Sequence, residues 1–217
     1  MNKLVIAAAG VSRSGKNSFC DLIHKKLENL GFTVKQHALA NQLKADLYFL
    51  IQHNLNIDVY KCNDVEKQLI RPILVEWGRI RRIQSKGIFW TNLVEQQIVK
   101  STSQIQLISD LRYDFYPEDE LFWLKKRMNG ILVHIKRYSA SECWPKNDPQ
   151  DIRIRREYIK APNEDEKIND PKLEATADYK VEWPTVPLDQ IESKQMPYID
   201  KFLEFLEPRL KELQCGQ

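Results

Sequence analysis

Hydrophobic residues along this chain fall into two alternating patterns. The run from Leu4 to Ala9 is apolar at every position, which is typical of a buried strand. Residues 16–30 follow with apolar side chains three and four positions apart, the spacing of an amphipathic helix. Both patterns recur and predict further strands near 32–38, 105–110, 131–135 and 179–183, and further helices near 40–53, 64–83, 90–98, 118–128 and 199–213.

Strands that alternate with helices indicate a parallel sheet covered on both faces. We therefore predict an α/β fold, a three-layer α/β/α sandwich with a mostly parallel five-stranded sheet, as a single domain over residues 1–217. The predicted core comprises about 1–40, 103–137 and 178–217, and about 40–102 form an inserted helical region. Six of the ten prolines lie between 138 and 187 amid dense charge, so about 138–177 is predicted to be an irregular segment.

The turn between the first strand and the first helix is rich in glycine, serine and basic residues. Such a turn directs backbone N–H groups into one concavity, which binds polyphosphate with help from the helix dipole. Lys16 is placed to reach the outer phosphates of ATP or GTP, and Ser18 to hold the Mg²⁺, in a G-K-x-[ST] arrangement. The predicted nucleotide-binding residues are Gly10, Ser12, Arg13, Ser14, Gly15, Lys16, Asn17 and Ser18.

Composition narrows the classes of protein to which the chain can belong. Lys+Arg 33 against Asp+Glu 30 is a small positive balance, which gives no reason to expect stable nucleic-acid binding. The four cysteines are far apart and lack metal-ligand spacing, so we expect free thiols. The first apolar run leads directly into the glycine turn, as a core strand does and a signal peptide does not, and no apolar stretch reaches membrane-spanning length. We expect a soluble, cytoplasmic protein with no membrane partner.

Charged side chains follow the strand predicted at 105–110. Ligands of parallel sheets bind beyond the carboxyl ends of the strands, so Asp110 and Arg112 should face the glycine-rich turn. Asp110 could hold Mg²⁺ and Arg112 could bind a phosphate through its forked guanidinium. Two alternatives stay open: Asp110 could cap the loop that follows, and Arg112 could form a surface ion pair with Asp114 or Glu118.

Two further groups of arginines are candidates for phosphate binding. Arg71 and Arg82 flank Trp77 on the third helical stretch, where Trp77 or Trp90 could form an aromatic wall for a base. Arg137 begins the irregular segment, which could close over a triphosphate. A solvated basic surface is the alternative for both groups. The predicted catalytic residues are Lys16, Asp110, Arg112 and Arg137.

Seven segments of the chain together carry a family resemblance. They are GVSRSGKNS at 10–18, HALANQLK at 37–44, RPILVEWG at 71–78, FW at 89–90, SDLR at 109–112, PNE at 162–164 and ADY at 177–179. Taken together they resemble the phage-type deoxynucleoside monophosphate kinases, a branch of the P-loop nucleoside monophosphate kinase-like proteins. The resemblance runs from about residue 3 to 183, and its most specific segment is the first.

The resemblance implies a P-loop kinase fold with a helical acceptor-binding insertion and a lid. The implied reaction is ATP + dNMP → ADP + dNDP with Mg²⁺, in the host cytoplasm if the chain comes from a phage, and a homodimer is left open. Lys16 and Ser18 are implied as donor-phosphate and metal groups, and Asp110 as a carboxylate near the metal or phosphate. The chain departs from the family at Trp183, where asparagine is common. The predicted substrate-binding residues are Lys44, Arg71, Trp77, Arg82, Trp90 and Arg112.

Three other functions fit parts of the pattern. One is another small-molecule P-loop kinase, similar to dephospho-CoA kinase. A second is a protein that binds nucleotide without transferring phosphate, which is suggested by Asn17 and by the altered motif of the third helix, at Val75 and Gly78-Arg79-Ile80. The third is an enzyme that acts on nucleic-acid ends, which the arginine clusters suggest.

Overall fold

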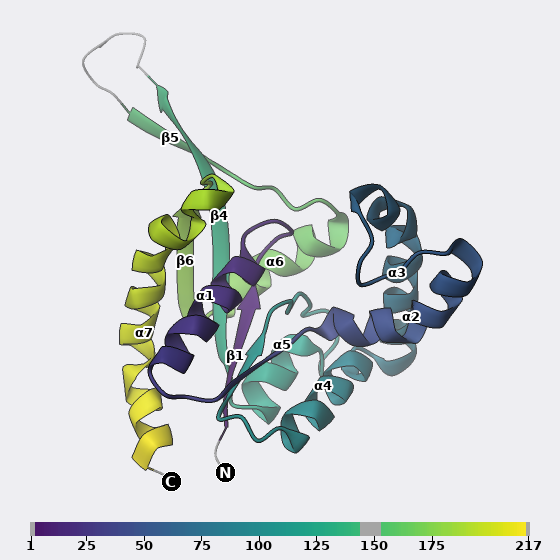
Figure 1. The fold of residues 1–217 in the computed structure, drawn as a ribbon, viewed down its shortest axis with the longest axis horizontal. Helices are drawn as coiled ribbons and strands as arrows, with labels where there is room; N and C mark the ends of the chain where they lie inside the picture. Colours follow the sequence, from purple (N-terminus) through teal and green to yellow (C-terminus); the bar gives the residue numbers. More distant parts are fainter. Residues whose placement is uncertain (1–2, 144–152, 216–217) are drawn as a thin grey trace.

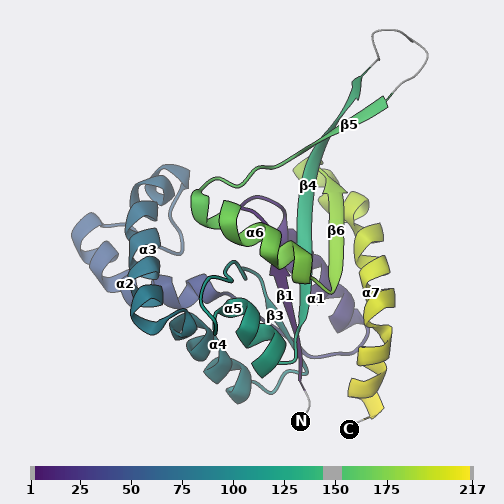
Figure 2. The same ribbon diagram turned by 180° about the vertical axis from the view of Figure 1, so that it is seen from behind.

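The protein is described by a computed structural model that covers residues 3–143 and 153–215. One sheet runs through the molecule, with helices on both of its faces (Figure 1, Figure 2). The elements in chain order are β1 (Leu4–Ala9), α1 (Lys16–Asn29), β2 (Val34–His37), α2 (Leu39–Leu55), α3 (Asp64–Ser85), α4 (Ile88–Lys100), β3 (Ile105–Ile108), α5 (Glu120–Phe122), the π-helical turn η1 (Trp123–Arg127), β4 (Ile131–Cys143), β5 (Arg153–Tyr158), α6 (Glu164–Thr176), β6 (Tyr179–Pro184), the 3₁₀ turn η2 (Leu188–Gln190) and α7 (Ile191–Cys215).

Five strands form a parallel sheet in the order β2-β3-β1-β4-β6. Ile6 of β1 lies beside Leu107 of β3 on one side and Ile131 of β4 on the other. The sixth strand, β5, pairs antiparallel with the far end of β4, where Tyr138 lies opposite Tyr158. The predicted three-layer α/β fold with a mostly parallel sheet is therefore confirmed. The described residues form six strands and not the predicted five, because β5 adds an antiparallel strand from the segment that was expected to be irregular.

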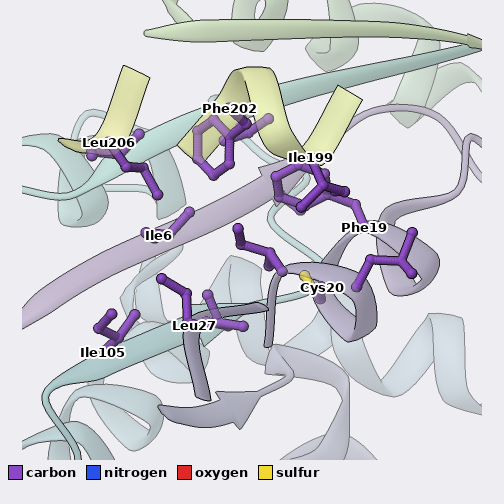
Figure 3. Close-up of a cluster of buried hydrophobic side chains, with 14 of the residues drawn as sticks. Ile6, Phe19, Cys20, Leu27, Ile105, Ile199, Phe202 and Leu206 are labelled. Carbon is purple, nitrogen blue, oxygen red and sulfur yellow. The ribbon is translucent and has the colours of Figure 1, made fainter. Parts of the chain in front are cut away.

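The two faces of the sheet are covered by different helices because successive residues of β1 point to opposite sides. Leu4, Ile6 and Ala8 belong to one buried cluster, and Val5, Ala7 and Ala9 to the other. Figure 3 shows the first cluster, in which side chains of α7 lie over β1 beside those of α1. Its labelled members are Ile6, Phe19, Cys20, Leu27, Ile105, Ile199, Phe202 and Leu206. The second cluster is covered by α4, α5, η1 and α6, which lie on the face away from α1 (Figure 2).

The helical region expected at about 40–102 projects from one side of the sheet as α2 and α3 (Figure 1). Its own small core consists of Leu47, Ile51, Ile57, Val59 and Ile70. Helix α3 begins at a complete capping box, in which the Asn63 side chain accepts from the Glu66 N–H and the Glu66 carboxylate accepts from the Asn63 N–H. Pro72 lies inside this helix without ending it.

The segment expected to be irregular, at about 138–177, differs from that expectation wherever the structure describes it. β4 continues to Cys143, β5 returns along it, and α6 fills residues 164–176. Residues 144–152 lie outside the described residues. The sequence did not predict α6 because only Glu166, Asn169 and Leu173 are buried in it, so it has no apolar stripe.

Three cysteines, Cys20, Cys62 and Cys215, are free thiols, as predicted, and the side chain of Cys143 lies outside the described residues. Cys20 is fully buried in the core, and this burial raises the pKa of its thiol. Among residues 3–143 and 153–215, none of the helices combines the length and the apolar character needed to cross a membrane.

Candidate active site

The glycine-rich turn leaves β1 at Gly10 and enters α1 at Lys16, and two of its glycines are required by its shape. Gly10 has φ +135°, and a Cβ there would lie 2.3 Å from the Ile135 carbonyl oxygen. Gly15 has φ +99°, and a Cβ there would lie 2.7 Å from the Trp183 ring. Only glycine fits at both positions, so the loop can approach its neighbours closely.

Trp183, near the end of β6, holds this loop in place through a hydrogen bond to its backbone. Its indole Nε1–H donates to the Ser14 carbonyl oxygen at 2.9 Å, and its ring is fully buried against Phe19 of α1. The departure from asparagine at this position therefore has a structural role that the sequence did not reveal. A signal existed, because the end of a core strand in a parallel sheet lies at the same edge as the turn.

Lys16 lies beneath the loop and is 7 % exposed. Its Nζ donates to the carbonyl oxygens of Gly10 at 2.7 Å and Val11 at 2.9 Å. Burial, followed by the positive charge of Arg112, lowers the pKa of Lys16 to about 8. A bound polyphosphate would reverse this, since a nearby opposite charge favours the protonated amine.

The loop already binds an anionic group of the protein itself. The Ser12 N–H donates to Oε2 of Glu166 at 2.6 Å, and Arg112 Nη1 donates to Oε1 of the same carboxylate at 2.9 Å. Glu166 lies in the first turn of α6 and is 7 % exposed. Its two oxygens stand where phosphate oxygens would be expected to bind, because backbone amides of such turns bind phosphate. The sequence analysis did not select Glu166.

Other polar groups around the loop lack partners among the described residues. The Ser14 hydroxyl is buried within the loop and makes no hydrogen bond, and Nε of Arg137 is likewise buried and unpaired. Burial, and then the charge of Arg13, lowers the pKa of Arg137. A bound anion would reduce the repulsion between Arg137 and Arg13, which belongs to the loop.

Asp110 follows β3 and lies near the loop, where the charges of Arg112 and Lys16 partly offset the rise that burial causes in its pKa. Its oxygens accept from the backbone N–H groups of Leu39 at 2.7 Å and Ala40 at 2.9 Å, so it caps the start of α2. Burial is the largest influence and leaves the pKa of Asp110 raised overall. The sequence left open that Asp110 caps the loop that follows it. The structure shows that Asp110 caps the start of α2 instead.

A Mg²⁺ site beside a bound triphosphate is consistent with the side chains present. In the part of the chain that the structure describes, no three His, Cys, Asp or Glu side chains are grouped to hold a metal ion. Ser18 is half-buried in the first turn of α1, whereas Asn17 is exposed. Hydroxyl and carboxylate oxygens are donors that Mg²⁺ prefers, and this ion usually takes its other ligands from phosphate and water. Ser18 and Asp110 therefore stay the predicted metal residues.

The predicted acceptor residue Arg82 is occupied by other contacts. Its guanidinium binds Asp119 at 2.5 Å and Glu120 at 2.8 Å, and lies 3.6 Å from the centre of the Tyr113 ring. The side chains of Asp119 and Glu120 are buried, and burial raises the pKa of Glu120 to about 7. We leave Arg82 out of the proposed acceptor site, because its charge joins α3 to the start of α5.

The two aromatic residues predicted to face the acceptor, Trp77 and Trp90, differ in how far they are buried. Trp90 is buried, and its Nε1 lies 3.4 Å from the Gly78 carbonyl oxygen. Trp77 is half-buried, and the Arg81 guanidinium lies 4.9 Å from its ring centre and 4.7 Å from that of Phe89. Nε of Arg81 is buried and has no partner among the described residues.

The other two acceptor candidates lie on the inserted helices. Lys44 of α2 is half-buried, with its Nζ 5.8 Å from the Tyr60 ring centre. Arg71 of α3 is exposed. The structure thus groups Lys16, Asp110 and Arg112 at the carboxyl edge of the sheet, and places Lys44 and Arg71 on the insertion.

Comparisons with known proteins give structural likenesses only. Neither a protein-family model nor a curated protein matches the sequence. The solved structures that match include shikimate kinase from Aquifex aeolicus, with 15 % identity, 95 % of this chain and 98 % of that chain covered, and a TM-score of 0.45. They also include TT1252 from Thermus thermophilus, with 12 % identity, 94 % and 99 % covered and a TM-score of 0.43. A gluconokinase from Sinorhizobium meliloti 1021 has 11 % identity, 96 % and 98 % covered and a TM-score of 0.37.

Proposed function

We propose that this chain transfers a phosphoryl group from ATP, with Mg²⁺, to a small acceptor, and that the acceptor is a nucleoside or deoxynucleoside monophosphate. One observation carries the proposal: the Ser12 N–H and the Arg112 guanidinium hold the two oxygens of one carboxylate beside the buried amine of Lys16. A loop that binds a carboxylate in this way has the donors that a phosphate requires.

Each donor-side residue has a distinct part in the proposed reaction. Phosphoryl transfer depends on positioning and on charge neutralisation. Lys16 would leave the carbonyl oxygens of Gly10 and Val11 to bind the outer phosphates, while Arg137 would bind phosphate through its unpaired Nε. Mg²⁺, when bound through Ser18 and Asp110, would neutralise charge on the donor phosphates.

The acceptor class is proposed from the insertion and from the family resemblance. Trp77, Arg81 and Phe89 form a stack of aromatic rings around a guanidinium, which suits a planar base and its phosphate.

The test is an assay of ADP release with ATP, Mg²⁺ and a panel of deoxynucleoside and nucleoside monophosphates. We expect turnover with at least one acceptor, and a loss of about 10²–10³-fold in kcat for Lys16→Ala, because a charge that stabilises the transition state is removed. Lys25→Ala is the control, since Lys25 lies on the same helix, exposed and paired with Glu192 at 3.4 Å. Its kcat should stay unchanged.

Two results would contradict the proposal. Absence of turnover with every acceptor, in folded protein with Mg²⁺, would reject the kinase. If such protein still bound ATP, the alternative of a nucleotide-binding protein without transfer would replace it. Equal kcat values for Lys16→Ala and the unmodified chain would show that the donor site lies elsewhere.

A further inference from the structure

The first turn of α6 contains an unusual use of a common helix-capping sequence. Asn163 is its N-cap, and the Asn163 side chain accepts from the Glu166 N–H at 2.8 Å. In a capping box, the glutamate at this third helical position returns the contact to the backbone N–H of the N-cap residue. Glu166 does not; its carboxylate reaches to Ser12 and Arg112 instead.

Helix α3 begins with the same Asn-x-x-Glu spacing, and there the glutamate makes the usual capping contact. Asn63 and Glu66 have the same separation as Asn163 and Glu166, and there the box is complete, with the Asn63 N–H donating to Glu66 Oε2 at 2.9 Å. The carboxylate of Glu166 therefore has a second, local position available to it. Moving there would satisfy the Asn163 N–H and would require only a change of side-chain rotamer.

The present position of Glu166 obstructs the loop. One carboxylate oxygen accepts a hydrogen bond from the Ser12 N–H, and the other accepts one from Arg112 Nη1. These are two groups that would donate to a bound phosphate. Further contacts hold α6 in place without touching the loop, including Asn169 Oδ1, which accepts from the Asp114 N–H, and Asp170, which lies 2.9 Å from His134. The helix can thus stay docked while Glu166 alone moves.

We propose that Glu166 is an autoinhibitory phosphate mimic with two positions. In the nucleotide-free protein its carboxylate fills the phosphate position and keeps Arg112 beside the loop. Nucleotide phosphate displaces it to the Asn163 N–H, where it completes the capping box of α6. This inference rests on the proposed function, and it adds that nucleotide binding must overcome a competing anion of the chain itself.

The test compares nucleotide affinity in Glu166→Gln, Glu174→Gln and the unmodified chain, using calorimetric titration with a non-hydrolysable ATP analogue and Mg²⁺. Glu166→Gln removes the competing charge and should bind the analogue about 10-fold more tightly, because a charge-assisted contact no longer has to be broken. Glu174→Gln is the matched control, since Glu174 lies on α6 and pairs with Lys136 at 2.5 Å, away from the loop. Its affinity should equal that of the unmodified chain.

The direction of the change separates the proposal from a merely structural role, because loss of a structural contact would weaken binding. Equal or weaker binding by folded Glu166→Gln would overturn the proposal and leave the proposed function standing. No binding by any of the three proteins would overturn both. If Glu166→Gln does not fold, Glu166→Asp keeps the helix-terminal charge but shortens the side chain, and it should also bind more tightly than the unmodified chain.

Discussion

At the scale of single residues, the site is built around a lysine whose pKa is lowered by its surroundings. Lys16 is buried beneath its own loop, and burial together with Arg112 lowers its pKa to about 8. Because an ordinary lysine has a pKa near 10.4, the free protein holds this amine partly neutral at mildly alkaline pH. Nucleotide binding adds negative charge close to it and must raise that pKa again.

We therefore expect nucleotide binding to take up protons above pH about 8, approaching one proton per nucleotide, and to take up almost none well below that pH. Calorimetric titration in buffers of different ionisation enthalpy measures this number directly. Lys16→Arg is the control, because arginine stays charged and should abolish the uptake while keeping a cation in place. The same binding enthalpy in all buffers for the unmodified chain at alkaline pH would contradict the expectation.

At the scale of elements, polar side-chain contacts attach several helices to the rest of the molecule. Helix α6 buries little apolar surface and is attached by Glu166, Asn169 and Asp170, while α2 is attached through Asp110. Partners this distant in sequence cannot be read from local periodicity, which explains why α6 went unpredicted although β1, α1 and α7 were predicted. The apolar stripe of α1 is, by contrast, a purely local signal.

Another polar contact of this kind is that of Arg82 with Asp119 and Glu120. Arg82→Ala should cost about 3–5 kcal/mol at pH about 8, because the two carboxylates would stay buried without the positive charge that Arg82 supplies. Since burial raises the pKa of Glu120 to about 7, the folded state binds more protons than the unfolded one, and stability falls as pH rises through about 7. The loss in Arg82→Ala should therefore be smaller at pH about 5, where the Glu120 carboxyl takes up a proton.

Urea unfolding at the two pH values measures this difference, with Arg79→Ala as the control. Arg79 lies one turn earlier on α3, and its contact with Glu76 is exposed, so its removal should leave the midpoint nearly unchanged at both pH values. A loss in Arg82→Ala that is the same at pH about 5 as at about 8 would show that the contact does not act through buried charge.

At the scale of the whole molecule, the sequence predicted the parallel sheet and the loop better than it predicted what closes over the loop. Gly10, Gly15 and Lys16 form a short continuous pattern, and the structure places them in one turn with the required backbone angles. Trp183 and Glu166 reach that turn from residues far along the chain, so only the fold brings them together. Arg82 was predicted to bind the acceptor, but it is paired with Asp119 and Glu120. A basic helix face in the sequence does not reveal which of its charges are already paired.

Hydrophobic clustering divides the molecule into a sheet with two large cores and an insertion with a small one, and this division leads to the last prediction. Ile70 and Ile23 are both fully buried, but Ile70 lies in the insertion core and Ile23 against the sheet. Replacing either by alanine should cost about 2–5 kcal/mol locally, through lost burial and the cavity that remains. Because regions with separate cores can open separately, the two changes should differ in where that cost appears.

Amide hydrogen exchange followed by mass spectrometry distinguishes the two variants. Ile70→Ala should speed exchange in α2 and α3 while the slowest amides of β1 and β3 keep their rates, whereas Ile23→Ala should speed exchange throughout the sheet. A nucleoside monophosphate added to the unmodified chain should slow exchange in α2 and α3, and an ATP analogue should slow it in α1. Equal acceleration of β1 and β3 by both variants would mean that sheet and insertion unfold as one unit, and the acceptor could then not order the insertion independently of the donor loop.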